Sequence, residues 1–342
     1  MFRNDYSEIA APQVMEALLA KGMEQNVGYG LDVHSAEAEK RILACFGLTK
    51  AEADVHFLAG GTQTNMTVIS YFLRPYEAVI ACDTAHINVH ETGAVEGSGH
   101  KVLTAPNADG KLLPADIEAI ARKHGDEHMV KPRMVYISDT TETGTTYTAA
   151  ELRAIRAACD AHGLILFLDG ARLGCALTAE DNDVTPELLG QLCDVFYAGG
   201  TKNGALFGEA VVLKKKLGAD TFRYHIKNRG AMLAKGFVCG IQFEALFTDG
   251  LYFKLAQHAN EMASVLRHGL LELGVELVGS SKTNQLFLRV DAKTAAMLTE
   301  RYGAEPNGEA DGLPVVRLVT SFATKKEDCD ELLTYLKTAS GR

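Results

Sequence analysis

The stretch RMVYISDTTETGTTYTAAELRAIRAACDAHGLILFLDGARLG, residues 133–174, holds two short apolar runs separated by an amphipathic one. The runs at 133–139 and 164–169 are mostly apolar and end in aspartate, which predicts two buried strands. Residues 149–163 carry apolar side chains at helical spacing and end in glycine, which predicts a helix. Buried strands joined by an amphipathic helix indicate a parallel sheet with helices on both faces.

The same alternation continues on both sides of this stretch and predicts one large α/β domain at 15–245, after an N-terminal segment at 1–14. Its further strands are predicted at 53–61, 78–83, 100–106 and 193–199, and its further helices at 36–46, 66–73 and 114–125.

Residues 246–342 show a different pattern, which predicts a small α+β domain with antiparallel strands. Helices are predicted at 253–274 and 326–339, and strands at 275–279, 284–290 and 315–322.

The composition is that of an ordinary globular protein, with 342 residues, 47% hydrophobic and 23% charged. A net charge of −10 argues against nucleic acid or an anionic membrane as the main partner. The chain has no long apolar run and a polar N-terminus, so we expect neither a membrane span nor a signal peptide. Seven scattered cysteines without a CxxC pair predict reduced thiols in a cytoplasmic protein.

Ligands of open α/β sheets bind at the carboxyl ends of the strands, and AGGTQTN (59–65) follows one such end. Its glycines would let backbone N–H groups at a helix start approach a phosphate, with Gly61 and Thr62 as candidate ligands. The segment has neither the GK[ST] of a P-loop nor GxGxxG. An ordinary strand–helix turn is the alternative.

Asp169 ends the second apolar strand, where a carboxylate is unfavourable unless it meets a cation. A protonated pyridine nitrogen would be such a partner, and the contact would strengthen the ring as an electron sink. A structural ion pair with Arg172, three residues further on, is the alternative.

Lys202 lies in FYAGGTKNGALFGEA (196–210), among small residues that leave its amine uncovered. A desolvated amine near another cation has a lowered pKa and can attack a carbonyl, which predicts an anchor for an aldehyde cofactor. A solvated surface loop is the alternative. An aldehyde anchor, a partner for a ring nitrogen and a phosphate site together predict pyridoxal phosphate.

His86, in DTAHINVHETGAVE (83–96), starts a predicted helix and could stack on a cofactor ring or move protons. With His90, four residues on, it could instead bind a metal or serve a structural role, and we predict no metal. Arg317 lies in an apolar strand and would bind a substrate carboxylate or, alternatively, form an internal salt bridge.

These segments resemble the pyridoxal-phosphate-dependent L-threonine aldolase family, within the β-eliminating lyases of fold type I. The resemblance runs nearly from end to end of the chain. The segments that carry it are FRNDYSEIAAP (2–12), VGYGLD (27–32), GGTQTN (60–65), TAHI (84–87), LDGARL (168–173), GGTKNG (199–204), KTNQLF (282–287) and VRLVTSF (316–322).

The resemblance implies an aspartate-aminotransferase-like fold and a role for each matched residue. Lys202 would hold the cofactor covalently, Asp169 would pair with its ring nitrogen, and His86 would stack on the ring. Gly61 and Thr62 would bind the phosphate. The remaining implied residues are Arg172, for cofactor and substrate, and Asn4, Tyr29 and Arg317 for substrate.

The resemblance also implies a homodimer or homotetramer with active sites at the dimer interface, where Tyr29 would enter from a neighbouring subunit. Asn4 stands where the family often has serine. The segment SDTTETG (138–144) has no histidine where many aldolases have one, and Glu142 or a threonine lies there instead. The catalytic base therefore stays open between His86 and a water near Glu142.

The implied reaction is the cleavage of L-threonine, L-allo-threonine and related β-hydroxy-α-amino acids to glycine and an aldehyde. Another pyridoxal-phosphate reaction on the same scaffold, β-elimination or transamination, is the first alternative. A nucleotide- or metal-dependent α/β enzyme and a non-catalytic binding protein are the alternatives of a different class.

Overall fold

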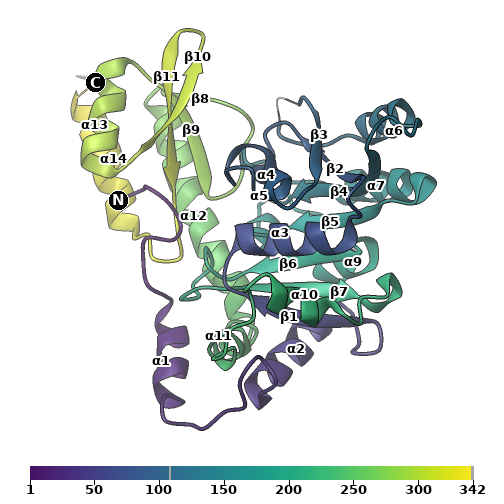
Figure 1. The fold of residues 1–342 in the computed structure, drawn as a ribbon. Coiled ribbons are helices and arrows are strands. Elements are labelled where there is room, and N and C mark those ends of the chain that lie inside the picture. The colour runs from purple at the N-terminus through teal and green to yellow at the C-terminus, as the bar shows by residue number, and fades with distance from the viewer. Residues whose placement is uncertain (108, 340–342) are drawn as a thin grey trace.

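The computed structural model describes residues 1–107 and 109–339, and its larger sheet has seven strands in the order β1-β7-β6-β5-β4-β2-β3 (Figure 1). The strands are β1 (Ala53–Leu58), β2 (Glu77–Cys82), β3 (Lys101–Ala105), β4 (Lys131–Ser138), β5 (Ile165–Asp169), β6 (Val195–Gly199) and β7 (Glu209–Lys214). Strands β2 to β6 are parallel to their neighbours in this group, and β7 is antiparallel to β1 and β6. The predicted, mostly parallel sheet is confirmed.

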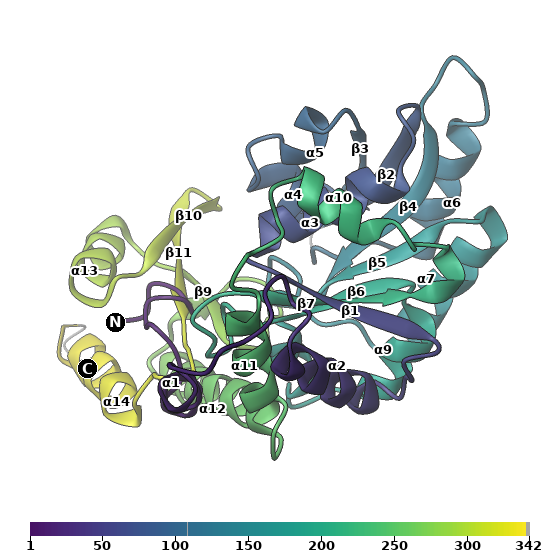
Figure 2. The ribbon, with the colours of Figure 1, turned by 60° about the horizontal axis from the view of Figure 1, so that its bottom comes forward.

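Helices cover both faces of this sheet (Figure 2). They are α1 (Pro12–Ala20), α2 (Val33–Cys45), α3 (Gly61–Phe72), α4 (His86–Val89), α5 (Ala94–Gly97), α6 (Pro114–Lys123), α7 (Ala149–His162), α8 (Leu173–Leu177), α9 (Pro186–Leu192), α10 (Phe222–Asn228) and α11 (Phe237–Leu246). One apolar core lies on the side of α2, α7 and α11, and a second lies on the side of α3 and α10. Alternate residues of each strand enter the two cores, as expected for a sheet buried on both faces.

The strand–helix–strand unit at 133–174 forms as its sequence predicts. Thr148 Oγ1 accepts the N–H of Glu151 at 3.2 Å, and the Glu151 carboxylate accepts the N–H of Thr148 at 2.7 Å. This capping box starts α7, and Gly163 ends it with a φ of 62°, which only glycine adopts readily.

Several elements were not predicted. Helix α11 is buried on nearly all sides, so its sequence has no amphipathic period, and the short strand β7 follows a glycine-rich loop. Helix α3 begins at Gly61 and not at residue 66, because the glycines there start the helix instead of ending the strand.

The second sheet is antiparallel throughout, in the order β10-β11-β9-β8, as predicted for the C-terminal strands. Its elements are α12 (Leu251–Glu272), β8 (Glu276–Leu277), β9 (Gln285–Arg289), α13 (Ala292–Tyr302), β10 (Glu305–Ala310), β11 (Leu313–Val319) and α14 (Lys326–Ala339). A third core lies between this sheet and its three helices.

The N-terminal residues connect the two sheets. Phe2 is buried in the third core, where its N–H donates to the Tyr302 carbonyl at 2.7 Å and its carbonyl accepts from Val319 at 2.8 Å. Further on, the N–H of Ala11 donates to the Gly204 carbonyl at 2.8 Å, next to the loop of Lys202. The limits 1–14, 15–245 and 246–342 stay a prediction. Among the described residues, no helix combines the length and the apolar character needed to cross a membrane.

Candidate active site

The candidate site lies along the edge where the parallel strands of the larger sheet end. Asp169 is the last residue of β5, and Lys202 lies just beyond the end of β6. Gly61 and His86 begin the helices that follow β1 and β2. Asp169 is close enough to His86 and to Lys202 to influence the pKa of both side chains. The structure therefore brings these sequence-distant groups together.

Two glycines allow β5 and β6 to approach each other at this edge. A Cβ on Gly170 would collide with the carbonyl oxygen of Tyr197, and a Cβ on Gly199 would lie 2.5 Å from the carbonyl oxygen of Ala171. The DGAR turn can thus lie against the end of β6, which places Asp169 beside the Lys202 loop.

Asp169 is buried, and four neutral donors surround its carboxylate. The hydroxyls of Tyr136 and Tyr197 each donate to it at 2.5 Å. Asn65 Nδ2 and the N–H of Ala171 each donate at 3.0 Å. Burial raises the pKa of Asp169, but the tyrosine hydrogen bonds, the charge of His86 and the Ala171 backbone hydrogen bond lower it more, so the carboxyl group is ionised. No described lysine or arginine bonds to this charge.

Asn65 also links Asp169 to His86 through Glu91, a connection that was not predicted. Asn65 Nδ2 donates to Glu91 Oε1 at 2.7 Å, and His86 Nδ1 donates to the same oxygen at 2.8 Å. Burial lowers the pKa of His86, but the Glu91 hydrogen bond and the charges of Glu142 and Asp169 raise it above its usual value. In the sequence, only spacing pointed to Asn65. It is four residues after Gly61 on α3, and residues four apart are neighbours on a helix.

A metal site at His86 and His90 was the alternative, and it would need further ligands. The described residues provide no further ligand there. The two imidazole rings are 5.5 Å apart. Within the described chain, no group of three or more histidine, cysteine or acidic side chains is placed to hold a metal ion.

The Lys202 amine has neither a hydrogen bond nor an ion pair with any described residue. Burial and the charge of Arg172 lower its pKa, and nearby carboxylates only partly offset this. Behind the loop, the buried Glu209 accepts the N–H of Gly200 at 3.1 Å. Burial raises the pKa of Glu209 to about 8, and its position was not predicted because no local pattern marks it. The arrangement leaves a lysine amine available for reaction with a carbonyl.

The segment at Gly60, Gly61 and Thr62 has the geometry of an anion site. The first helical hydrogen bond of α3 goes from Thr64 N–H to Gly60 O at 3.0 Å, so the preceding N–H groups of Gly61 and Thr62 have no backbone acceptor among the described residues. A Cβ on Gly60 would meet no atom within 4 Å, which leaves open space in front of this helix start. Thr62 is exposed.

Arg172 is paired with a residue that was not predicted. Its Nε and Nη2 donate to the two carboxylate oxygens of Asp5 at 2.7 and 3.1 Å, and Asn284 donates to Asp5 at 2.9 Å. The alternative ion pair of Arg172 with Asp169 is therefore wrong. Nη1 of Arg172 has no partner among the described residues, and its charge lies near Lys202. In the sequence, the feature that could have pointed to Asp5 is its place in FRNDYSEIAAP, one of the segments that carry the family resemblance.

Arg317 forms the internal salt bridge that was left open as an alternative. Its Nη2 contacts the carboxylate of Glu305 on β10, and Nη1 donates to Gln285 Oε1 at 3.4 Å. Its Nε is buried without a partner among the described residues. Arg317 lines a cavity of about 400 Å³ together with His90 and Glu142. Its substrate role stays a prediction.

Glu142 makes no hydrogen bond or ion pair with the described residues, and its charge influences the pKa of His86, Arg172 and Lys202. It lies between the cofactor side of the site and the cavity that Arg317 lines.

Asn4 and Tyr29 make other contacts in this chain. Asn4 Oδ1 accepts from the N–H of Tyr6 at 3.0 Å and from Ser7 Oγ at 2.9 Å. Tyr29 is 46% exposed, and the centre of its ring lies 5.1 Å from Nζ of Lys227 on α10. Both substrate contacts stay predictions.

The residues at the edge fit the predicted cofactor. Asp169 would hold a protonated ring nitrogen, because its charge meets only neutral donors. Lys202 would hold the aldehyde carbon, and the open helix start at Gly60 would hold the phosphate.

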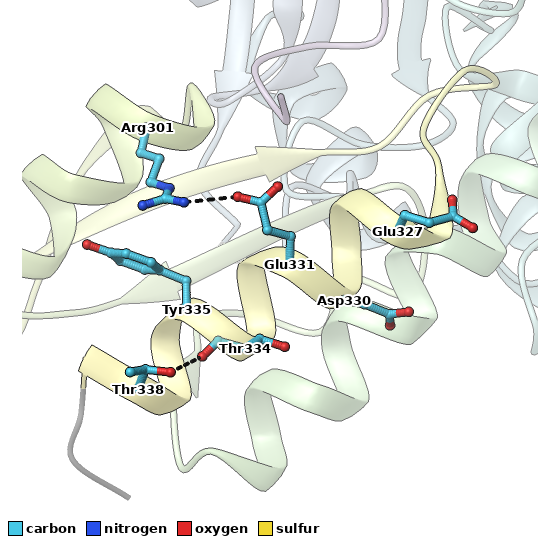
Figure 3. Close-up of a pocket in the computed structure, with 7 residues that line it drawn as sticks. All are labelled: Arg301, Glu327, Asp330, Glu331, Thr334, Tyr335 and Thr338. Atoms are coloured by element: carbon cyan, nitrogen blue, oxygen red, sulfur yellow. Dashed lines mark hydrogen bonds and ion pairs between the residues drawn. The ribbon is translucent and has the colours of Figure 1, made fainter.

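Another hollow, of about 740 Å³, lies on the outer side of the small sheet, between α13 and α14 (Figure 3). Arg301 spans it, with its guanidinium carbon 4.2 Å from the centre of the Tyr335 ring and an ion pair to Glu331 at 3.1 Å. None of the candidate site residues lines this hollow, so we place the candidate active site at the edge of the larger sheet.

Comparison with known proteins gives matches over most of the chain. The family model described as "Beta-eliminating lyase" matches residues 2–293. A low specificity L-threonine aldolase of Pseudomonas sp. (strain NCIMB 10558) is 35% identical over 294 residues, which are 84% of this chain and 83% of that protein.

Among solved structures, a threonine aldolase of Leishmania major matches with a TM-score of 0.96 and 45% identity, over 99% of this chain and 98% of that one. A methionine aminotransferase of Escherichia coli matches with a TM-score of 0.75 and 14% identity, over 99% of this chain and 93% of that one. The second likeness concerns the fold alone, and the predicted aminotransferase-like fold class is confirmed.

Proposed function

The chain belongs to the β-eliminating lyase family, and we propose that it cleaves L-threonine, L-allo-threonine and related β-hydroxy-α-amino acids to glycine and an aldehyde. Its cofactor is pyridoxal phosphate. The observation that carries this proposal is the pairing of an ionised Asp169, bonded only by neutral donors, with an unpartnered Lys202 amine on the same sheet edge.

When bound, pyridoxal phosphate withdraws the electrons of the bond that breaks. The residues of the chain then have separate tasks. Lys202 Nζ would hold the aldehyde carbon of the cofactor, and Asp169 would keep the ring nitrogen protonated. Arg172, through its free Nη1, and Arg317, through its unpartnered Nε, would bind the substrate carboxylate and so set the direction of the Cα–Cβ bond.

Two groups are candidates for taking the proton of the substrate β-hydroxyl. His86 uses Nδ1 for Glu91, so Nε2 is its remaining proton acceptor. Glu142 has no partner among the described residues and could accept the proton directly or through a water. Glu142 also lines the cavity that Arg317 lines, and we propose that the proton goes to His86 or to a water held by Glu142.

The proposal extends to the assembly and the location of the protein. We propose a homodimer or homotetramer in the cytoplasm, with a site completed by Tyr29 of a neighbouring copy. The segment around Tyr29 supports this, because Val27, Leu31 and Val33 are 64%, 64% and 69% exposed.

The test is an absorbance spectrum of the purified protein with pyridoxal phosphate, followed by assays of glycine and acetaldehyde from L-threonine and L-allo-threonine. We expect a visible band that borohydride removes and equal amounts of the two products. An oxo acid with ammonia would instead indicate elimination, and a colourless protein that does not bind the cofactor would overturn the proposal. Another pyridoxal-phosphate lyase or an aminotransferase is not favoured, because the similar curated protein named above is an aldolase.

A further inference from the structure

Asn65 is completely buried on the second turn of α3, and it lies between two buried carboxylates. Its Nδ2 donates one hydrogen to Asp169 Oδ2 at 3.0 Å and the other to Glu91 Oε1 at 2.7 Å. Its Oδ1 has no partner among the described residues. The two hydrogens of a single amide group are therefore directed at two carboxylates, and the Tyr136 hydroxyl oxygen lies further from Nδ2, at 3.5 Å.

The orientation of this amide follows from its neighbours. Ionised carboxylates only accept hydrogen bonds, so a flipped Asn65 would direct Oδ1 at two acceptors. The Glu91 side chain is completely buried, and Oε1 also accepts from His86 Nδ1 at 2.8 Å, while Oε2 has no partner among the described residues. Asn65 and His86 are thus the two donors that hold Glu91 in place.

We propose that Asn65 is a positioning residue of the reaction, because its amide ties Asp169 to the Glu91–His86 pair and so holds the ring-nitrogen partner and the stacking imidazole in a fixed relation. The proposal rests on the function proposed above and on the stacking of His86 on the cofactor ring that the family resemblance implies. Helix α3 then serves two parts of the site, since its start would bind the phosphate and its second turn holds this link.

The link has a consequence for the charge of His86. The groups that face this imidazole are the carboxylates of Glu91, Glu142 and Asp169 and the ring of His90 at 5.5 Å. Without Asn65, two of these carboxylates lose a neutral donor and attract the imidazole proton more strongly. The pKa of His86 should therefore rise in Asn65→Leu, and it should fall in Glu91→Gln, which removes the hydrogen-bonded charge.

A matched control is present in the same chain. Asn260 on α12 is also buried, donates both amide hydrogens, to the Cys175 carbonyl at 2.9 Å and to Thr178 Oγ1 at 3.0 Å, and leaves Oδ1 unpartnered. Its partners are neutral and lie outside the candidate site. Asn260→Leu therefore reproduces the loss of a buried amide without the loss of the link between charges.

The experiment follows the His86 ring by NMR in full-length protein labelled at the histidine Cε1 carbons, with and without pyridoxal phosphate, assigned with His86→Gln. We expect a higher pKa of His86 in Asn65→Leu, a smaller rise in Asn65→Ser, which keeps one donor hydrogen, and the unchanged value in Asn260→Leu. In the loaded enzyme, Asn65→Leu should lower kcat about tenfold with little change in KM, and its pH profile should move in the same direction as the pKa.

An unchanged pKa of His86 in both Asn65 variants would overturn the proposal, as would equal losses of kcat in Asn65→Leu and Asn260→Leu. Far-UV circular dichroism shows whether Asn65→Leu folds. If it does not fold, Asn65→Ser still tests the proposal. Failure of the wild-type protein to bind pyridoxal phosphate would instead count against the proposed function, and the titration without cofactor would still test the link.

Discussion

The site contains two charged side chains that are held in opposite ways: Asp169 is buried, and the side chain of Arg317 is 20% exposed. Asp169, at the centre of the parallel sheet, is kept ionised by four neutral donors and meets no described cation by direct contact. Arg317, on the antiparallel sheet, already contacts the carboxylate of Glu305. A cationic ligand of Asp169 therefore meets a charge to which no described cation is bonded, whereas an anionic ligand of Arg317 must compete with an existing partner.

This difference separates two sides of the site. The side around Asp169 and its donors is the prepared side, and the side around Arg317 and Glu305 is the adjustable side. The donors of Asp169 come from the larger sheet, α3 and the DGAR turn, and its three side-chain donors, Tyr136, Tyr197 and Asn65, are buried. Glu305 lies on β10, and its side chain is 36% exposed, so it can turn to solvent when a substrate carboxylate arrives. We expect changes on the prepared side to abolish the chemistry, and changes on the adjustable side to alter substrate affinity.

The largest effect is expected for Lys202→Ala on the prepared side. It should abolish the visible band of the bound cofactor and lower kcat by more than about a thousandfold, because the covalent anchor is lost. Circular dichroism should remain unchanged, because the amine makes no hydrogen bond to the described residues. A band that borohydride still removes would place the anchor at another lysine.

A smaller but still large effect is expected for Asp169→Asn. The substitution keeps the shape of the side chain and removes its charge, so kcat/KM should fall about a hundredfold, the scale for losing one preorganised electrostatic contact. The measurement is steady-state kinetics at saturating pyridoxal phosphate. Turnover close to the wild-type value would remove the role of Asp169 at the ring nitrogen.

On the adjustable side, Arg317→Gln and Glu305→Gln should act in opposite directions. Arg317→Gln should raise KM for the amino acid about tenfold or more, because a charged hydrogen bond to the carboxylate is lost. Glu305→Gln removes the competing carboxylate and should lower KM. If KM is the same in all three proteins, the Arg317–Glu305 pair is structural and the contrast between the two sides fails.

The last effect concerns stability instead of activity and is expected for Asp139→Asn, beside the prepared side. Burial raises the pKa of Asp139 from 3.8 to about 8. Between these values the unfolded chain has lost the proton and the folded chain retains it, so the free energy of unfolding falls as pH rises. The contribution is at most about 1.4 kcal/mol per pH unit.

Denaturant unfolding of the wild type and of Asp139→Asn from pH 5 to pH 8 measures this dependence. The variant should lose less stability over the range, although the buried Glu209, with a pKa of about 8, keeps part of the slope. Identical slopes would show that Asp139 is ionised in the folded protein.

The sequence alone determined the parallel sheet, the end of β5 at Asp169 and the loop of Lys202. It also marked Gly61 as part of a phosphate site, although it predicted the start of α3 five residues too late. These features depend on short patterns, such as apolar runs, helical spacing and glycines, which act over a few neighbouring residues. Their meeting at one edge followed from a general rule, because parallel strands end on the same side of a sheet.

Only the tertiary structure decided which partners these residues have. Asp169 binds Tyr197 and Tyr136, 28 and 33 residues away, and Asn65, 104 residues away. Arg172 binds Asp5 at a separation of 167 residues, although Asp169 is only three positions away in the sequence. No local pattern specifies such pairs, because the hydrogen-bond partner of a buried charge is set by the chain segments that pack against it after folding.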